Sequence, residues 1–172
     1  EQEYEKSLAD FSQVRRLDPT EKVPPIEIRT YEKLVDMYLR EERYEEGIKV
    51  LERGLMELPN HAKIQLLYGD VWLVQRQYDR AVQAYSAALS IDDIPAHRTK
   101  QLRANLLWAV HLKNQGDRIH AWEKVSNAYH QDSSFVEQYF QKNPQQHEAF
   151  CAANAESHTN VDVQSTIKVI CQ

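Results

Sequence analysis

Apolar residues recur at intervals of three and four along most of the chain, as expected for helices with one buried face. In the segment 30–42 the recurring residues are Tyr31, Leu34, Val35 and Tyr38. After a short polar break the pattern resumes at Ile48 and stops at Pro59, a residue that cannot continue a helix. The pattern therefore predicts two helices joined by a short turn.

The same pattern occurs three times. Residues 29–60 align with residues 63–94 without a gap, at a spacing of 34 residues. A third copy, residues 101–132, follows 40 residues after the second, so we infer about six inserted residues near 96–101. Residues 4–19 match only the second half of the unit. This spacing predicts a repeat protein in which each helix pair buries its faces against the next.

Each copy carries two small residues seven positions apart in its second helix, which places both on one face. The pairs are Gly47 with Gly54, Ala81 with Ala88, and Ala121 with Ala128. A face without bulk allows the neighbouring helix to approach closely. Because glycine inside a helix costs about 0.5–1 kcal/mol relative to alanine, Gly47 and Gly54 require such a contact.

This unit resembles the tetratricopeptide repeat, a 34-residue helix-turn-helix with small residues at these helix contacts and proline at its end. Two departures from that pattern, where a large aromatic residue is usual, are Gln65 and Asn105. The resemblance covers residues 4–132, about three and a half repeats. It implies an all-α right-handed superhelix of antiparallel helix pairs, with a concave face lined by the first helix of each pair.

The repeat register also predicts the domain limits. The array covers residues 1–142, and a C-terminal helix with an irregular tail covers residues 143–172. Within the array the predicted parts are a half repeat at 1–19, repeats at 28–61, 62–95 and 102–132, and a partial helix at 133–142.

The C-terminal region is less regular. Ser133 or Ser134 is a candidate N-cap for a short helix. Asn143 and Pro144 form an N-cap and first-turn pair, which predicts a further helix through residue 157. Residues 161–172 mix alternating and helical apolar spacing, so strand, helix and ordered coil all stay open there.

Charge and hydropathy exclude two classes of partner. A formal net charge of −5 opposes broad binding to nucleic-acid phosphates, which requires clustered Lys and Arg. The best apolar stretch, residues 64–74, is interrupted by Gly69 and Asp70 and is shorter than a membrane span. We therefore expect no nucleic acid and no membrane span; a protein or peptide partner is what the repeat resemblance implies.

Two cysteines, Cys151 and Cys171, lie near the C-terminus. We expect free thiols in a reducing compartment, and hence a cytoplasmic protein, with nuclear and periplasmic locations as alternatives. A disulfide that closes the tail is the other interpretation of these cysteines, and the sequence leaves it open.

No catalytic or cofactor-binding motif accompanies the repeats. The chain has four glycines and no glycine-rich phosphate loop, and no serine occupies a nucleophile elbow. His111 and His120 flank a turn, but no set of Cys or carboxylate residues completes a metal site. Cys151 lies in an alanine-rich stretch and is interpreted as a small buried residue. We therefore expect no enzyme activity, no cofactor and no metal.

The resemblance implies which residues of each first helix face the concave groove. In the first full repeat they are Arg29, Glu32, Lys33, Asp36, Leu39 and Arg40. In the second repeat they are Lys63, Leu66, Leu67, Asp70, Leu73 and Val74, and in the third Arg103, Leu106, Leu107, Val110 and Lys113. The last two sets form an apolar strip with a basic rim and are the predicted partner-binding residues. Packing between repeats is the alternative role for the apolar members.

The same register excludes one binding mode of the family. Repeats that hold the C-terminal carboxylate of a chaperone use Lys, Asn and Arg at inward positions. Asp36 and Leu67 occupy the positions where Asn is expected. Because Asp36 would repel a carboxylate and Leu67 cannot donate a hydrogen bond, we do not expect binding of chaperone tails.

These observations predict a non-catalytic interaction module or scaffold that binds an apolar or amphipathic segment of a partner protein in its concave groove. Two alternatives stay open. One is a structural subunit that self-associates, as a homodimer or within a larger assembly. The other is a regulatory domain of a larger enzyme.

Overall fold

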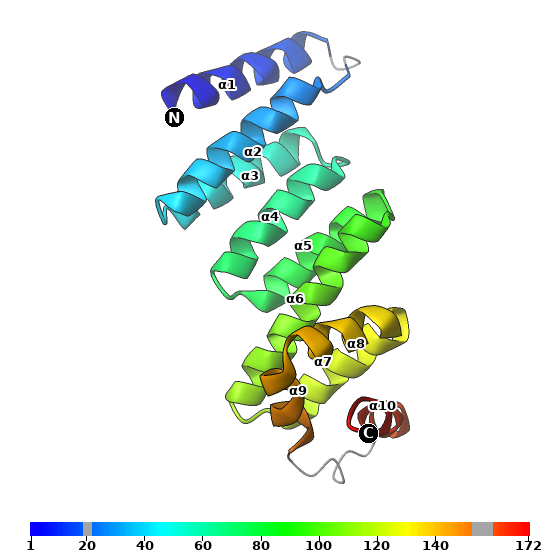
Figure 1. The fold of residues 1–172 in the computed structure, drawn as a ribbon. Helices are drawn as coiled ribbons and strands as arrows, with labels where there is room; N and C mark the ends of the chain where they lie inside the picture. The colour runs from blue at the N-terminus through cyan, green and yellow to red at the C-terminus, as the bar shows by residue number, and fades with distance from the viewer. Residues whose placement is uncertain (19–21, 153–159) are drawn as a thin grey trace. The chain divides into compact units, whose positions relative to one another are not determined.

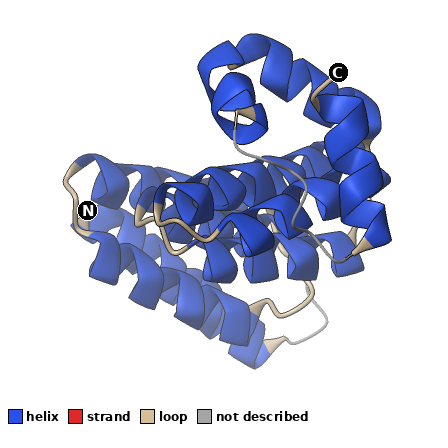
Figure 2. Ribbon diagram, turned by 90° about the horizontal axis from the view of Figure 1, so that it is seen from below, coloured by secondary structure: helices blue, strands red, loops and turns tan. Residues whose placement is uncertain are grey.

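The computed structural model describes residues 1–18, 22–152 and 160–172. Within these ranges the regular elements are all α-helices and none is a strand, which confirms the predicted all-α class (Figure 1, Figure 2). The described helices are α1 (Gln2–Leu17), α2 (Pro25–Arg40), α3 (Tyr44–Glu57), α4 (Ala62–Val74), α5 (Tyr78–Ile91), α6 (Pro95–Asn114), α7 (Arg118–Gln131), α8 (Ser133–Lys142), α9 (Pro144–Cys151) and α10 (Val161–Ile170).

The chain divides into two compact units, Glu1–Arg98 and Thr99–Gln172. The first unit contains α1 to α5 and the start of α6, and its successive helices run back and forth (Figure 1). The second contains the rest of α6 and α7 to α10. The residues inserted near 96–101 lie within α6, which has 20 residues against 13 in α4. The insertion therefore lengthens a helix instead of forming a loop.

The turn inside each helix pair is built in the same way. Glu42, Arg76 and Gly116 occupy equivalent positions and have left-handed φ angles of 58°, 59° and 88°. In each turn the next amide donates to a carbonyl five residues back, as Arg43 does to Tyr38 at 2.8 Å. This bond satisfies a carbonyl at the end of the first helix. Of the three residues, only glycine adopts the left-handed conformation without a steric cost.

The predicted small residues are buried at helix contacts. They are Gly47, Gly54, Ala81, Ala88, Ala121 and Ala128. A Cβ atom on Gly54 would lie 2.9 Å from Cε1 of Tyr31, so the tyrosine ring requires the missing side chain. Gly47 differs, because an added Cβ would lie 3.6 Å from that of Tyr38, an ordinary contact. A close helix contact therefore explains the glycine at position 54 but not the glycine at position 47.

Gly69 makes a closer contact that the small-residue pattern did not predict. A Cβ atom at this position would lie 2.5 Å from Cε1 of Tyr85. The Tyr85 hydroxyl donates to Oδ1 of Asp70 at 2.7 Å, which fixes where the ring lies. The glycine inside α4 thus allows α5 to pack against α4 through an aromatic ring.

α1 packs on the first full repeat through both apolar and polar contacts. The buried residue of α1 is Leu8. Arg15 lies 2.5 Å from the carboxylate of Glu27 on α2, whose side chain is 1% exposed. Arg15 also approaches Glu57 of α3 at 3.4 Å, and that carboxylate accepts a hydrogen bond from Ser12. Because a buried carboxylate requires a charged or hydrogen-bonded partner, Arg15 ties α1 to α2.

The core of the second unit contains an aromatic cluster. The ring of Phe150 packs edge-on against Trp122 and Phe140, with centroid distances of 5.2 and 5.7 Å. α10 packs against α7, where the hydroxyls of Ser126 and Thr166 lie 3.1 Å apart in a buried position. The helices that follow the last repeat therefore complete the core of this unit.

The start of α8 differs from the prediction. Its N-cap is Asp132 and not Ser133 or Ser134. Oδ1 of Asp132 accepts a hydrogen bond from the amide of Phe135 at 2.9 Å. A carboxylate also carries the charge that the positive end of a helix favours, so Asp132 begins the helix one residue earlier.

The other C-terminal predictions concern α9 and α10. α9 begins at Pro144 as predicted and ends at Cys151; residues 153–157 of the predicted helix lie outside the described residues. Residues 161–170, which the sequence left open, form α10. Its N-cap is Asn160, whose Oδ1 accepts from the amide of Asp162 at 2.9 Å.

Cys151 and Cys171 are joined by a disulfide, so the expectation of free thiols is wrong. Their Cα atoms are 5.4 Å apart. Nε2 of His147 lies 2.6 Å from the carbonyl oxygen of Ile170, a second contact between α9 and the end of α10. This proximity arises from the packing of α10, which the sequence did not reveal. The cysteines therefore give no support for a cytoplasmic location.

Candidate interaction clefts

Several of the predicted groove residues on α4 have partners within the first unit. Lys63 pairs with Glu32 at 2.7 Å, and Asp70 accepts the hydrogen bond from Tyr85. Leu66 is 4% exposed and lies in the interior, the alternative role considered for it. The half-buried or exposed apolar members are Leu67, Leu73 and Val74, and of these Leu67 packs partly against the core of the first unit. Only a short apolar stretch of the predicted α4 face is therefore accessible.

The predicted residues on α6 divide similarly. Leu106 is 1% exposed, and Val110 packs against the core of the second unit. The ammonium group of Lys113 lies 5.7 Å from the ring centroid of Phe150. The two members that line a cleft within the second unit are Arg103 and Leu107. A groove that joins the α4 and α6 sets stays a prediction.

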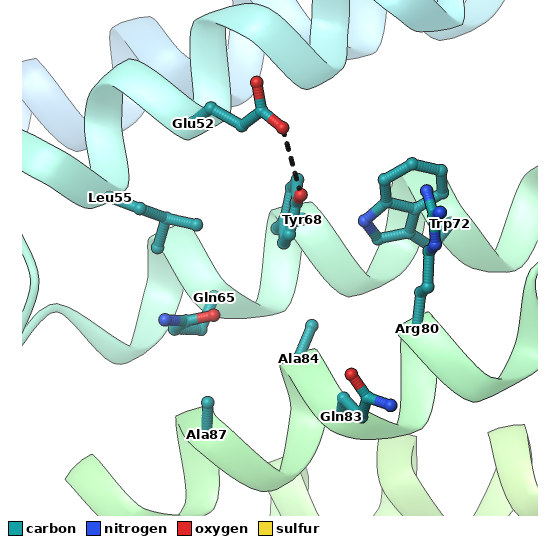
Figure 3. A pocket seen from close by; sticks show the side chains of 9 residues that line it. All are labelled: Glu52, Leu55, Gln65, Tyr68, Trp72, Arg80, Gln83, Ala84 and Ala87. Atoms are coloured by element: carbon teal, nitrogen blue, oxygen red, sulfur yellow. Dashed lines mark hydrogen bonds between the residues drawn. The ribbon is translucent and has the colours of Figure 1, made fainter.

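An open cleft of about 480 Å³ lies between α3, α4 and α5 in the first unit (Figure 3). Its lining residues are Glu52 and Leu55 of α3, Gln65, Tyr68 and Trp72 of α4, and Arg80, Gln83, Ala84 and Ala87 of α5. The α4 members are spaced by three and four residues and therefore share one face. Of the predicted groove residues on α4, Leu67, Asp70 and Val74 have the same spacing but each lies two positions later in the chain. Since an α-helix turns by about 100° per residue, they lie about 200° around the helix from the cleft residues. The cleft thus lies on the face of α4 opposite the predicted groove.

Two aromatic rings form one wall of this cleft. Tyr68 and Trp72 pack edge-on with centroids 5.6 Å apart, and the guanidinium of Arg80 stacks 4.4 Å from the centroid of Trp72. The Tyr68 hydroxyl lies 3.4 Å from Oε1 of Glu52, as the dashed line in Figure 3 shows. Burial raises the pKa of Tyr68, with a further contribution from Glu52, so the phenol stays protonated and can donate at neutral pH.

Side-chain amides and small residues complete the cleft. Figure 3 places Gln65 of α4 across from Ala87 of α5, with Gln83 further along α5. Among the described residues neither amide has a side-chain hydrogen-bond partner, so each offers a donor and an acceptor to a bound segment. Ala84 and Ala87 leave room above α5 because their side chains are short. Aromatic rings beside unpaired amides suit a peptide, whose backbone needs both donors and acceptors.

The sequence contained a signal for this cleft that the repeat register did not use. Gln65 stands where the repeat usually has a large aromatic residue, and the cleft lies at that position. A smaller, polar side chain there leaves open a space that a ring would fill. The register led instead to the opposite face, because that face carries the family's usual binding residues.

Among the described residues no group of three or more His, Cys, Asp or Glu side chains is placed to hold a metal ion. Nδ1 of His120 lies 2.7 Å from Asp117, the N-cap of α7, and this hydrogen bond lowers the pKa of Asp117. His120 therefore contributes to the start of a helix. In the part of the chain that the structure describes, no helix combines the length and the hydropathy needed to cross a bilayer.

Comparison with known proteins agrees with the repeat assignment. Residues 38–106 match the sequence profile described as tetratricopeptide repeat, which confirms the resemblance for this segment. That segment includes α4 and α5 and most of the residues that line the cleft. Over residues 38–106 the chain is therefore similar to tetratricopeptide repeats, and the regular elements of the described residues are those of an all-α protein.

No curated protein sequence gives a significant match. Among solved structures, the crystal structure of BtubC (BKLC) from P. vanneervenii is similar over 98% of this chain and 79% of that chain. The sequence identity is 13% and the TM-score 0.46, a similarity too low to carry an argument about this chain.

Proposed function

We propose that this chain is a non-catalytic interaction module that binds a segment of another protein. Tetratricopeptide repeats generally mediate protein–protein interaction, and residues 38–106 match that family. The observation that carries the proposal is the open cleft between α3, α4 and α5, with unpaired amides beside an aromatic wall.

The chemistry of the cleft defines the segment that it accepts. Glu52 and Arg80 bring one charge of each sign, so the cleft favours a segment with little net charge. An apolar side chain of the partner fits above Ala84 and Ala87, where it covers the exposed edge of Tyr68. Gln65 and Gln83 pair with the partner backbone. The expected ligand is a short segment with one or two apolar anchors, bound across α4 and α5.

The opposite face of α4, as predicted from the repeat register, is the alternative surface for the same function. Its accessible residues are Leu67, Leu73 and Val74, and Val74 is 51% exposed. We favour the cleft because a concave site buries more of a bound segment than a short exposed stripe does.

Two arginine substitutions on opposite faces distinguish these surfaces. Peptides selected by display against the full chain serve as ligands. Ala87→Arg fills the cleft and should reduce binding by at least about tenfold, equivalent to roughly 1.4 kcal/mol. Val74→Arg, the matched control, adds the same side chain to the other face and should leave binding unchanged. The reverse result would place the ligand on the predicted groove face.

Display that yields no binding peptide would contradict the proposal. Circular dichroism of both variants controls for misfolding, since each changed residue is at least partly exposed.

A further inference from the structure

A second cleft, within the second unit, carries a different charge. It has a volume of about 340 Å³ and lies between α6, α8 and the first turn of α9. Its apolar lining comes from Leu107, Phe135 and Tyr139. Its charged lining residues, among those that the structure describes, are Arg103 of α6 and Lys142 of α8, and none of them is a carboxylate. The two cations therefore stand beside an apolar surface.

Neither cation is neutralised by another residue that the structure describes. Among the described residues Arg103 and Lys142 have no ion-pair partner, and both side chains are exposed. This differs from Arg15 and Arg43 of the first unit, which pair with Glu27 and Glu1. An unpaired basic pair in a concave site gives a local positive potential that attracts acidic groups.

Hydrogen bonds already present in the cleft orient two of the side-chain amides that line it. The Tyr139 hydroxyl donates to Oε1 of Gln146 at 2.8 Å, which orients this amide and leaves its NH₂ group available. Nδ2 of Asn143 donates to the carbonyl oxygen of Tyr139 at 2.7 Å and leaves its own Oδ1 as an acceptor. Together with Arg103 and Lys142, the NH₂ group of Gln146 gives a surface that favours an acceptor-rich ligand.

We propose that this cleft binds an acidic segment of a partner protein, with carboxylates at Arg103 and Lys142 and an apolar side chain against Leu107 and Phe135. The proposal rests on the proposed function and adds a second site with its own ligand class. The apolar lining distinguishes a peptide from a simple anion, which would bury no apolar surface. Two cations on a chain of net charge −5 are too few for a nucleic acid.

The test uses the full chain and a defined probe, a fluorescein-labelled peptide of twelve residues with Asp and Glu around two Leu. A second peptide has Asn and Gln in place of the acids. Fluorescence anisotropy should show binding of the acidic peptide only, and the affinity should fall as salt is raised. Equal affinity for the two peptides, or no binding of either, would overturn the proposal.

Variants locate the site. Arg103→Glu with Lys142→Glu should lower the affinity for the acidic peptide by about tenfold or more, because each change replaces an attraction with a repulsion. Arg118→Glu with Lys168→Glu makes the same change in net charge at exposed positions outside the cleft, and should have little effect. If both double variants lose the same affinity for the acidic peptide, the peptide is attracted by charge in general and not by this cleft, and the proposal is overturned.

Two further outcomes also decide the matter. If Ala87→Arg abolishes binding of the acidic peptide and the Arg103 and Lys142 variant does not, this inference fails while the proposed function stands. If sedimentation without peptide shows a dimer that the Arg103 and Lys142 variant dissociates, the occupant is a second copy of the chain, and the proposal of an acidic partner is overturned.

Discussion

The two units are stabilised in different ways. In residues 1–98 glycines admit tyrosine rings at helix contacts, and the buried Glu27 is paired with Arg15. In residues 99–172 the ring of Phe150 joins an aromatic cluster, and a disulfide links α9 to the end of α10. The first unit uses the same kind of contact, a glycine against a tyrosine ring, between helices that are near in sequence. The core of the second unit is completed by α10, which packs against α7 from a distant part of the sequence.

The charge of the chain is also divided unequally. The first unit has 14 Lys and Arg against 19 Asp and Glu, and the second has seven of each, so the net charge of −5 belongs to the first unit. The charge of each cleft differs from the net charge of its unit: among the described lining residues, the first cleft has one charge of each sign and the second has two cations. Net charge therefore gives little information about the ligand of either cleft.

The largest effect that we predict concerns the buried ion pair of the first unit. Arg15→Met leaves the carboxylate of Glu27 buried without a partner and should reduce the free energy of unfolding by about 3–5 kcal/mol, or release α1. Arg16→Met, an exposed neighbour, is the control and should change little. Urea denaturation and limited proteolysis measure the two effects. The double variant Arg15→Met with Glu27→Gln removes the buried charge and should recover part of the stability. If it is no more stable than Arg15→Met alone, the unpaired carboxylate is not the cause of the destabilisation.

The second prediction concerns the disulfide of the second unit. Replacing Cys151 and Cys171 by serine should cost about 2–4 kcal/mol, since the bridge closes a loop across a separation of 20 residues. Amide exchange should accelerate in α9 and α10 and stay unchanged in α1 to α5. A reducing agent should have the same effect on the original chain and none on the serine variant. Equal stability of both proteins would show that the helices are held by packing alone.

The third prediction compares two glycines of the first unit. Gly69→Ala forces a Cβ against the ring of Tyr85 and should destabilise by about 1–3 kcal/mol. Gly47→Ala makes an ordinary contact and gains helix propensity, so it should be neutral or stabilise by up to about 1 kcal/mol. Thermal unfolding of both variants tests the sign of the difference. Equal effects would show that the space around Gly69 is not limiting.

The smallest effect concerns the turn that both units share. Arg76→Gly relieves a left-handed conformation in the first unit and should stabilise by about 0.5–1 kcal/mol. Gly116→Ala introduces the same strain in the second unit, where a Cβ meets no atom within 4 Å, and should destabilise by about 1 kcal/mol. Changes in the free energy of unfolding with opposite signs would confirm that the two turns are equivalent. Changes with the same sign would contradict this equivalence.

The helical repeats could be predicted from sequence because their signals are local. The apolar spacing predicted the two helices of each repeat. The small residues Gly54, Ala88 and Ala128 predicted where these helices make close contacts. The disulfide and α10 could not be predicted, since they depend on α10 packing against α7. The register placed Arg103 and Leu107 in the predicted groove, and both line the cleft between α6, α8 and α9; their role in partner binding stays a prediction. It could not show that Leu66 is buried, because the width of the space beside α4 depends on neighbouring helices.

Methyl NMR of the full chain with a display-selected peptide tests the central claim most directly. The claim is that the partner binds the cleft between α3, α4 and α5. Methyl signals of Leu55, Ala84 and Ala87 should then shift on titration, together with the indole signal of Trp72. Shifts confined to the methyl groups of Leu67, Leu73 and Val74 would contradict the account and place the partner on the opposite face of α4.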